Sequence, residues 1–303
     1  MNKEKLLAYL QLIRLPNVFT AISNIVMGFM FAKGWPDAIG IPYLVSLVLS
    51  SCCLYSGGMV LNDVYDYDVD AQERPQRPLP SGRIALSWAK QLGFGLLAAG
   101  ILLAAFPGIG TFHAKSAIIA TILAICIYLY DSVAKKTEAA PILMGSCRTL
   151  NILLGMSCGI LATDQWLVAI GIGVYVAGIT WFARCEAKTS SRQTLTFGLV
   201  VMLLGIGVLS AWPWFSDKMI WFKSTLHWPT LLVLLVTSVT RRCVLAISNP
   251  EPKNVQNAVK HAIFSLVVFD AAVAMAVLGP YAAVLVLLLL IPTMFLGRWI
   301  YST

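Results

Sequence analysis

The chain has 303 residues, of which 58% are hydrophobic and only 12% are charged, against a charged share of roughly 25% in an ordinary soluble domain. This composition excludes a soluble globular enzyme, and the dense apolar runs exclude a disordered chain. The net charge of +8 would suggest nucleic acid in a soluble protein, but basic residues in short loops between apolar runs set membrane orientation, so we expect no nucleic-acid partner.

Apolar segments long enough to cross a bilayer fill the chain. A transmembrane helix needs about 20 apolar residues to span a hydrocarbon core of ~30 Å. The predicted crossings are residues 15–32, 39–62, 88–112, 116–130, 139–162, 165–183, 194–214, 226–247, 261–279 and 281–298. Their interiors are rich in Leu, Gly, Ala and Ser, as in helices that pack closely in lipid, and they lack the alternation of a β-barrel. The sequence therefore predicts an all-α, polytopic integral membrane helical bundle, with one domain over residues 1–303.

The distribution of Lys and Arg predicts the orientation of this bundle. Four of the 22 fall on the side opposite the N-terminus, Arg148 falls inside a crossing, and the other seventeen fall on the side of the N-terminus. The four are Lys33, Lys115, Lys218 and Lys223. Because cytoplasmic loops carry the excess of Lys and Arg, we expect a cytoplasmic N-terminus, in the cytoplasmic membrane if the source is bacterial.

The number of crossings in the last apolar stretch determines on which side of the membrane the C-terminus lies. Residues 262–297 would form a helix of about 54 Å, too long for one crossing. Gly279-Pro280 offers a break within it. We therefore count ten crossings and expect both termini in the cytoplasm.

An acidic stretch follows the second predicted crossing, in the sequence NDVYDYDVDAQERPQRPLPSGRI of residues 62–84. If the helix continues to Asp70, then Asn62, Asp66 and Asp70 stack on one face, each about 6 Å above the last. Such a ladder repels itself unless a cation binds it. Two carboxylates and an amide oxygen at a membrane surface suit Mg²⁺, which is usually held by one or two carboxylates and by substrate phosphates. The ladder therefore predicts half of a metal diphosphate site.

Three arginines follow the ladder in a proline-rich loop. The fixed φ angles of the prolines would hold Arg74, Arg77 and Arg83 near the acids, and arginine is a matched donor for a metal-bound phosphate. The alternative is that the acids are a solvated helix end and the arginines only set orientation. The spacing N-D-x-x-D-x-x-x-D, followed at once by R-P-x-R-P-L-P-S-G-R-I, favours the site.

This segment resembles the first aspartate-rich motif and the following R-P-L-x-S-G tail of the UbiA family of intramembrane prenyltransferases. The place of the loop after the second helix and the all-helical length extend the resemblance over most of the chain. The family implies a UbiA-like bundle, with nine helices where we count ten. It also implies that Asn62, Asp66 and Asp70, with Asp63 beside them, hold Mg²⁺ that bridges to a prenyl diphosphate.

Two other fragments resemble parts of the family's head-group cavity. Arg14 and Asn17, in LIRLPNVFT, resemble the polar start of its first helix. The sequence YLYDSVAKK of residues 128–136 resembles the region that faces the diphosphate, so Tyr128, Lys135 and Lys136 are candidates. The alternative for the two lysines is that they only set orientation.

An ionisable side chain lies inside the fifth predicted crossing. Arg148 lies at a position where a charged side chain is costly in free energy, so such a residue indicates a functional site. We expect it to line the cavity. The alternative is a structural pairing with Asp270 in the ninth crossing.

The chain departs from the family at the second acidic motif, which family members carry after the sixth helix. In TWFARCEAKTSSRQTL of residues 180–195, Glu186 is the single acid among basic residues. We expect Arg184, Lys188 and Arg192 to supply direct charge in place of a second metal, with Glu186 orienting them or supplying one ligand. The R-x-E pattern of Arg184 and Glu186 is similar to that of EboC-like members.

The resemblance implies a Mg²⁺-dependent prenyltransferase. Its expected partners are a prenyl diphosphate, the lipid bilayer and a lipophilic acceptor, either aromatic or another small nucleophile. Tyr55, Trp181 and Phe182 near the cap are candidates for shielding the allylic cation, although such aromatics also serve as packing. The alternative is a non-catalytic polyprenyl-phosphate or lipid-phosphate binding or transport protein, which the missing second motif favours and the clustering of acids at one face disfavours.

Overall fold

The computed structural model describes residues 3–108, 111–185, 190–218, 221 and 227–299. All regular elements in these ranges are helical, as predicted. In chain order they are α1 (Lys3–Leu12), α2 (Leu15–Lys33), α3 (Gly40–Tyr65), α4 (Tyr67–Glu73), α5 (Leu86–Ala105), α6 (Ala114–Ser132), η1 (Ala134–Lys136), α7 (Ala140–Met156), α8 (Thr163–Phe182), η2 (Ala183–Cys185), α9 (Arg192–Ser210), η3 (Trp212–Phe215), α10 (His227–Ser248), α11 (Pro252–Leu278), α12 (Pro280–Leu287) and α13 (Leu290–Trp299).

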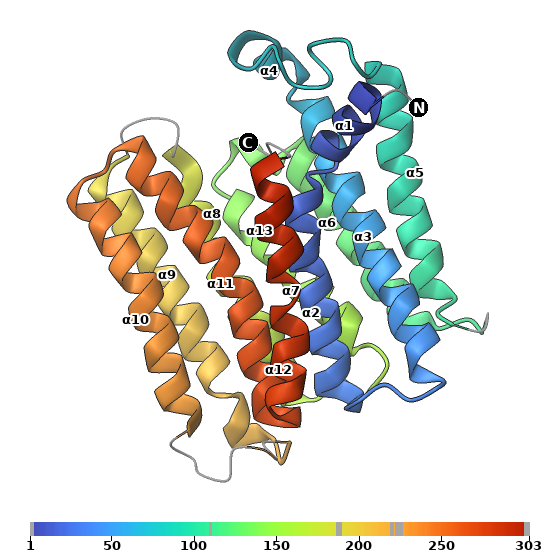
Figure 1. Cartoon of the computed structure of the whole chain (residues 1–303), viewed down its shortest axis with the longest axis vertical. Helices are drawn as coiled ribbons and strands as arrows, with labels where there is room; N and C mark the ends of the chain where they lie inside the picture. Colours follow the sequence, from blue (N-terminus) through green and yellow to red (C-terminus); the bar gives the residue numbers. More distant parts are fainter. Residues whose placement is uncertain (1–2, 109–110, 186–189, 219–220, 222–226, 300–303) are drawn as a thin grey trace.

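The long helices run up and down one bundle (Figure 1). In the described part of the chain, nine helical segments are long and apolar enough to cross a membrane, and α7 is a shorter apolar helix of 17 residues. At 1.5 Å per residue α7 is about 25 Å long, which is close to the thickness of the hydrocarbon core. Helix α1 and the end of α13 lie at the same end of the bundle (Figure 1), as an even number of passes requires.

Proline and glycine decide where several helices begin and end. The predicted crossing 88–112 is too long, because α5 ends at Ala105, just before Pro107. The predicted crossing 261–279 starts too late, because α11 begins at Pro252, a residue that favours the first helical turn. The break at Gly279 is present, with φ +90°, between α11 and α12.

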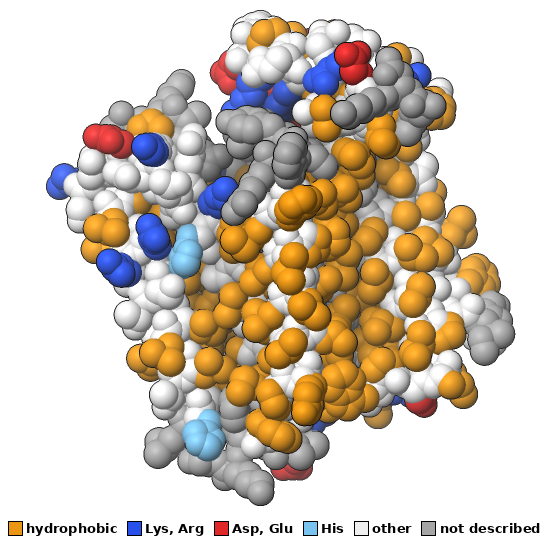
Figure 2. Space-filling view, viewed as in Figure 1, with side chains coloured by type: hydrophobic (Ala, Val, Ile, Leu, Met, Phe, Trp, Pro, Cys, Tyr) orange, Lys and Arg blue, Asp and Glu red, His pale blue; other side chains and the backbone are white. Residues whose placement is uncertain are grey.

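The surface has an apolar belt and a charged end. Apolar side chains cover the centre and right of the face seen in Figure 2, whereas Lys and Arg gather in the half of the molecule that carries α4. Large apolar residues such as Leu102, Ile118 and Phe295 are about 60% exposed. Such an exposed belt matches a protein that lies in the hydrocarbon of a bilayer.

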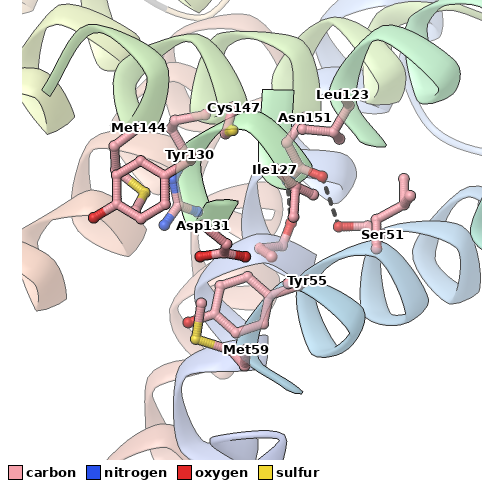
Figure 3. Close-up of a pocket in the computed structure, with 14 residues that line it drawn as sticks. Ser51, Tyr55, Met59, Leu123, Ile127, Tyr130, Asp131, Met144, Cys147 and Asn151 are labelled. Atoms are coloured by element: carbon pink, nitrogen blue, oxygen red, sulfur yellow. Dashed lines mark hydrogen bonds between the residues drawn. The ribbon is translucent and has the colours of Figure 1, made fainter. Parts of the chain in front are cut away.

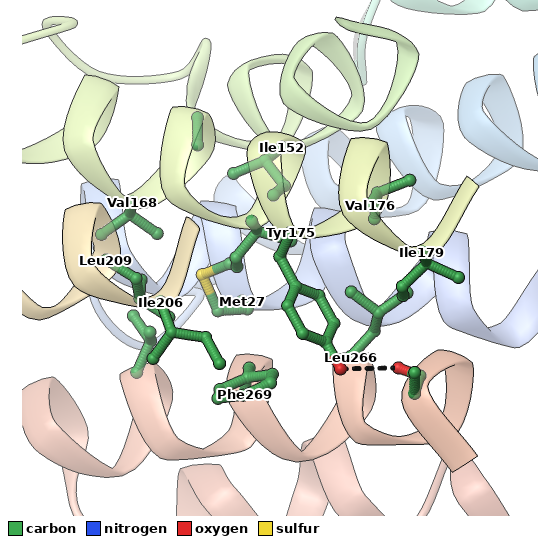
Figure 4. Close-up of a cluster of buried hydrophobic side chains, with 14 of the residues drawn as sticks. Met27, Ile152, Val168, Tyr175, Val176, Ile179, Ile206, Leu209, Leu266 and Phe269 are labelled. Atoms are coloured by element: carbon green, nitrogen blue, oxygen red, sulfur yellow. Dashed lines mark hydrogen bonds between the residues drawn. The ribbon is translucent and has the colours of Figure 1, made fainter. Parts of the chain in front are cut away.

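The main buried cluster runs through most of the bundle, and Figure 4 shows the part where α2, α7, α8, α9 and α11 pack together. At its centre the hydroxyl groups of Tyr175 and Ser265 share a hydrogen bond of 2.7 Å. The Tyr175 ring meets Phe269 edge to face, with ring centroids 5.1 Å apart. The tyrosine therefore packs its ring in the core while its hydroxyl stays hydrogen-bonded.

Two glycines allow α2 and α7 to touch backbone to backbone. A Cβ added at Gly155 would lie 2.7 Å from the carbonyl oxygen of Ile25, and one added at Gly28 would lie 2.8 Å from that of Ile152. Small residues at such contacts are typical of helices in membranes. This close packing brings the polar side chains of α2 and α7 together inside the bundle.

Candidate functional site

The aspartate ladder lies where α3 passes into α4. The chain is interrupted at one residue, Asp66, which ends α3 and precedes α4. The backbone N–H of Asp66 donates to the carbonyl of Asn62 at 3.0 Å, and that of Asp70 donates to the carbonyl of Asp66 at 2.8 Å. The four-residue helical spacing predicted for the ladder is therefore kept across the interruption.

Two arginines form ion pairs at the ladder, Arg14 near its first residue and Arg77 with its last residue, Asp70. Arg14 donates to Oδ1 of Asp63 at 3.2 Å and to Oδ1 of Asn62 at 3.4 Å. Nη1 of Arg77 lies 2.6 Å from Oδ2 of Asp70 and 3.5 Å from Oδ1 of Asp63. The side chains of Asp63 and Asp70 are about 7% and 5% exposed, so these ion pairs are largely shielded from water.

Arg14 reaches the ladder from an unusual backbone conformation. Its φ of 48° and ψ of 50° are left-handed, and it is the one non-glycine residue with positive φ in the described ranges. For an ordinary side chain this conformation costs about 1–2 kcal/mol. Burial is the largest single effect and would lower the pKa of Arg14, but the charge and hydrogen bond of Asp63, with the charges of Tyr55 and Asp66, together outweigh it, so the pKa is raised. The ion pair with Asp63 thus further favours the charged form of this guanidinium.

Helix α6 and the turn after it supply the other side of the site. Oδ1 of Asp131 accepts a hydrogen bond of 2.9 Å from the side-chain amide of Asn62. The Lys135 ammonium forms an ion pair with Oδ2 of Asp66, whereas Lys136 is exposed. Sequence reasoning missed Asp131, because the predicted crossing 116–130 stops one residue before it, whereas the observed α6 continues to Ser132 and includes this acid.

An apolar cavity adjoins the ladder between α2, α3, α6 and α7. It is lined by Ala21, Ser51, Leu54, Tyr55, Gly58, Met59, Leu123, Ile127, Tyr130, Asp131, Met144, Cys147, Arg148 and Asn151. Figure 3 shows the carboxylate of Asp131 and the rings of Tyr55 and Tyr130 around one space. Since Asp131 also touches Asn62, the ladder and the cavity form one continuous site.

The tyrosine of α6 that lines this cavity is not the one that the sequence analysis singled out. Tyr128, expected to face the diphosphate, is 40% exposed and its ring lies against Tyr65 and Phe94. Tyr130 lines the cavity instead. Two residues along an α-helix correspond to a rotation of about 200°, so the two tyrosines point in nearly opposite directions.

Of the three aromatic residues expected to shield a cation, Tyr55 lines the cavity. Phe182 is instead 1% exposed within the core, and the Trp181 ring packs 4.8 Å from that of Phe197. Asn17 lies in the first turn of α2, where its backbone N–H donates to the carbonyl of Arg14 at 2.9 Å. Arg74 is half-buried at the C-terminal end of α4.

Arg148 lies in the cavity lining and is tied to α2. It donates to Oδ1 of Asn24 at 2.6 Å and to the backbone carbonyl of Thr20 at 3.0 Å. The alternative of pairing with Asp270 is realised only indirectly, because Nδ2 of Asn24 donates to Oδ2 of Asp270 at 2.7 Å. An asparagine thus separates the two charges.

The region of the missing second motif is only partly described. Arg184 donates to Oε2 of Glu138 at 2.6 Å and to the carbonyl of Thr137 at 2.8 Å. Its guanidinium lies 4.6 Å from the Trp181 ring centroid. Arg184 therefore fastens the end of α8 to the loop that follows Lys135. Glu186 and Lys188 lie outside the described residues.

The oxygen atoms of the ladder fit a hydrated magnesium ion. Across the ranges that the structure describes, no three His, Cys, Asp or Glu side chains form a closed metal cage. Mg²⁺ does not need one, since one or two carboxylates with phosphate and water usually hold it. Lys135 contacts one oxygen of Asp66, and Arg77 contacts one oxygen of Asp70. The second oxygen of each carboxylate is left for a cation.

The fold and the site define a multi-pass membrane protein with a charged, oxygen-rich cap over an apolar cavity. The profile of the UbiA prenyltransferase family matches residues 21–236, which is more than half of the chain. The chain therefore belongs to the UbiA prenyltransferase family.

Two archaeal relatives carry the name digeranylgeranylglyceryl phosphate synthase. The protein of Sulfurisphaera tokodaii is 34% identical over 235 residues, which cover 76% of this chain and 77% of that protein. The protein of Saccharolobus solfataricus is 33% identical over 164 residues, which cover 54% of this chain and 55% of that protein.

Solved structures share the fold. One described as a digeranylgeranylglyceryl phosphate synthase in membranes has a TM-score of 0.68 at 23% identity and covers 90% of this chain and 99% of its own. A UbiA homologue from Archaeoglobus fulgidus, bound to GPP and Mg²⁺, has a TM-score of 0.64 at 15% identity and covers 88% of this chain and 99% of its own.

Proposed function

We propose that this chain transfers a prenyl group from a prenyl diphosphate to a lipophilic acceptor, with Mg²⁺ as cofactor. The observation that carries this proposal is the ladder of Asn62, Asp66 and Asp70, which lies among three buried or half-buried cations beside an apolar cavity. The Archaeoglobus fulgidus homologue that binds GPP and Mg²⁺ supports the same ligands here.

The charged groups divide into two sets. Asn62, Asp66 and Asp70, with Asp63 beside them, would hold Mg²⁺ through oxygen atoms. Bound Mg²⁺ would neutralise the negative charge of the diphosphate leaving group. Arg14, Arg77 and Lys135 come from three separate segments and can turn from the acids to phosphate oxygens, which suit guanidinium and ammonium donors. We also assign Arg74, Lys136 and Lys188, which the sequence analysis predicted, to the set of cations that would bind the diphosphate.

The transfer step exchanges one bond for another. The bond between C1 of the prenyl group and the diphosphate oxygen breaks, and its electron pair leaves with the diphosphate. The nucleophilic atom of the acceptor forms a bond to C1, and the released diphosphate takes the acceptor proton. The apolar walls of the cavity keep water away from the allylic cation, and the Tyr55 and Tyr130 rings face the same space.

The acceptor class is open to a direct comparison. The archaeal relatives are named for a glyceryl phosphate that carries two geranylgeranyl groups. This supports a geranylgeranylglyceryl phosphate as the first acceptor to test, beside the aromatic nucleophile that the sequence suggests. The similarity to EboC-like members stays a prediction.

The placement in the membrane is also proposed. The excess of Lys and Arg at the end with α4 supports a cytoplasmic cap and a cytoplasmic N-terminus. We further propose that residues 1–303 act as one domain, because the ladder at the junction of α3 and α4, the lysine after α6 and the arginine before α2 meet at one site.

A transfer assay tests the proposal. The purified protein in lipid nanodiscs receives labelled geranylgeranyl diphosphate, Mg²⁺ and either geranylgeranylglyceryl phosphate or an aromatic hydroxycarboxylate. We expect a labelled lipid product that is lost when Mg²⁺ is chelated. Tight binding of the diphosphate without transfer to any acceptor would instead favour a lipid-phosphate binding protein.

A further inference from the structure

A second polar cluster lies deeper in the bundle than the ladder. It consists of Thr20, Ser23 and Asn24 on α2, Arg148 on α7 and Asp270 on α11, and we call it the deep polar cluster. Thr20 and Asn24 follow Arg14 by six and ten residues, which places them about 9 and 15 Å further along the helix. The deep polar cluster is therefore separate from the cations of the cap.

The guanidinium of Arg148 keeps its positive charge beside the cavity. Its hydrogen bonds go to the carbonyl of Thr20 at 3.0 Å, to Oγ1 of Thr20 at 3.4 Å and to Oδ1 of Asn24 at 2.6 Å. All three acceptors are neutral oxygens of α2. Among the described residues, no carboxylate lies within ion-pair distance of Arg148.

Asp270 supports Arg148 through Asn24. Asp270 is fully buried, and its Oδ2 accepts hydrogen bonds of 2.6 Å from Ser23 and 2.7 Å from Asn24. Because Asp270 takes the amide N–H of Asn24, the amide oxygen of Asn24 is turned toward Arg148. Oδ1 of Asp270 has no hydrogen-bond partner in the described part of the chain, so this carboxylate serves the cluster on one side only.

We propose that Arg148 binds an oxyanion of the acceptor, either a phosphate or a carboxylate, inside the cavity. Asn24 and Asp270 are then positioning residues that hold the guanidinium toward it. The inference rests on the proposed transferase function. An arginine in a membrane interior that meets only neutral groups is costly, and an oxyanion both compensates the charge and matches the planar fork of the side chain.

The diphosphate does not need Arg148. The cap has its own cations in Arg14, Arg77 and Lys135, each in contact with an acid of the ladder or with Asp63 beside it. An acceptor whose oxyanion lies at Arg148 would extend its nucleophilic atom toward the cap, where C1 of the prenyl group lies. Arg148 would thus select the acceptor without touching the leaving group.

The test measures equilibrium binding to the purified protein in nanodiscs. The oxyanion probes are geranylgeranylglyceryl phosphate and an aromatic hydroxycarboxylate, 4-hydroxybenzoate, which separate a lipid phosphate from an aromatic carboxylate. The neutral counterparts are geranylgeranylglycerol and phenol, and geranylgeranyl diphosphate with Mg²⁺ reports on the cap. The variants are Arg148→Gln, Arg148→Lys and Asp270→Asn, and Asp164→Asn is the control.

Asp164 is a matched control because it is also a buried acid, 3% exposed, that pairs with Lys218 away from the cavity lining. We expect Arg148→Gln to weaken binding of one oxyanion probe roughly 10- to 100-fold, the range for a hydrogen bond to a charged group. Arg148→Lys should retain part of this binding, and Asp270→Asn should weaken it less than Arg148→Gln. Binding of the neutral counterparts and of geranylgeranyl diphosphate should change less than about twofold.

Three results would overturn the inference. Equal weakening of the neutral and anionic probes would assign Arg148 a structural role, and thermal unfolding of each variant separates this from misfolding. A matching loss of geranylgeranyl diphosphate binding would place Arg148 in the diphosphate site. A wild-type protein that binds neither oxyanion probe would also contradict it. A protein that binds an oxyanion through Arg148 yet transfers no prenyl group would keep this inference and refute the proposed function.

Discussion

The side-chain amide of Asn62 donates a hydrogen bond of 2.9 Å to Asp131, a carboxylate 69 residues later in the chain. This bond joins the first residue of the ladder to the wall of the cavity, since Asp131 also lines that cavity. It also fixes the direction of the amide, whose Oδ1 is left facing Arg14. The group that would bind the metal and the space that would hold the prenyl chain are therefore positioned by one contact.

The role of the ladder can be tested by comparing its two acids with Asp68, an exposed acid of the same motif. Asp66→Asn and Asp70→Asn each remove a charge from the proposed metal ligands, so the transfer rate should fall roughly 10²- to 10³-fold or more. Asp68→Asn is the control, because Asp68 is exposed on α4. Initial rates with labelled geranylgeranyl diphosphate measure the effect. Equal rates for all three variants and the wild type would show that Asp66 and Asp70 hold no metal that the transfer needs.

Arg184 is expected to act through the loop that carries Lys135. Arg184→Ala removes the contacts with Glu138 and Thr137, so the KM for the prenyl diphosphate should rise, while Arg192→Ala should leave it unchanged. Arg192 belongs to the same basic segment, but the structure places it exposed and bonded to the carbonyl of Ser248 instead of to the loop after Lys135, so it serves as the control. Since the ion pair is partly exposed, we expect only about a 3- to 10-fold rise. A kcat that falls while KM stays constant would point to direct action on the leaving group.

The two tyrosines of α6 give a sharp comparison. Tyr130→Ala should reduce transfer and release free prenyl alcohol, because an aromatic wall of the cavity is lost and water can reach the cation. Tyr128→Ala should behave like the wild type, because that ring lies on the outer side against Phe94. The ratio of alcohol to transfer product measures this. The opposite ranking would mean that the family-based assignment of Tyr128 is right.

Much of this site could be predicted from the sequence, because charges in an apolar chain stand out. The crossings, the Gly279 break and the four-residue spacing of the ladder follow from apolar length, proline or glycine breaks and helical period. Arg14 was found through its resemblance to the family, and the structure adds the left-handed turn that aims it.

The rest depends on rotation and on partners distant in the chain. Which of Tyr128 and Tyr130 faces inward depends on how α6 is rotated against its neighbours, and two alternating tyrosines give no such signal. The role of Asn24 could not be predicted either, because its two bonds join α7 and α11, whose pairing with α2 is tertiary.

The orientation in the membrane has a simple test. Reporter fusions after Thr303 should give a cytoplasmic signal, because ten passes return the chain to the side of the N-terminus and that side carries the excess of Lys and Arg. A fusion in the loop between α5 and α6 should report the opposite side. A lumenal or periplasmic signal at Thr303 would mean nine crossings and would leave the ladder unaffected.

The most direct test of the ladder as a metal diphosphate site is the coupling between its two proposed ligands. Thermal unfolding is measured for the purified protein with Mg²⁺ alone, with geranylgeranyl diphosphate in excess chelator, and with both. Each ligand completes the coordination of the other, so both together should raise the Tm by more than the sum of the separate shifts. Asp70→Asn should abolish this excess and Asp68→Asn should keep it. Full protection by the diphosphate in chelator, unchanged in Asp70→Asn, would contradict the account.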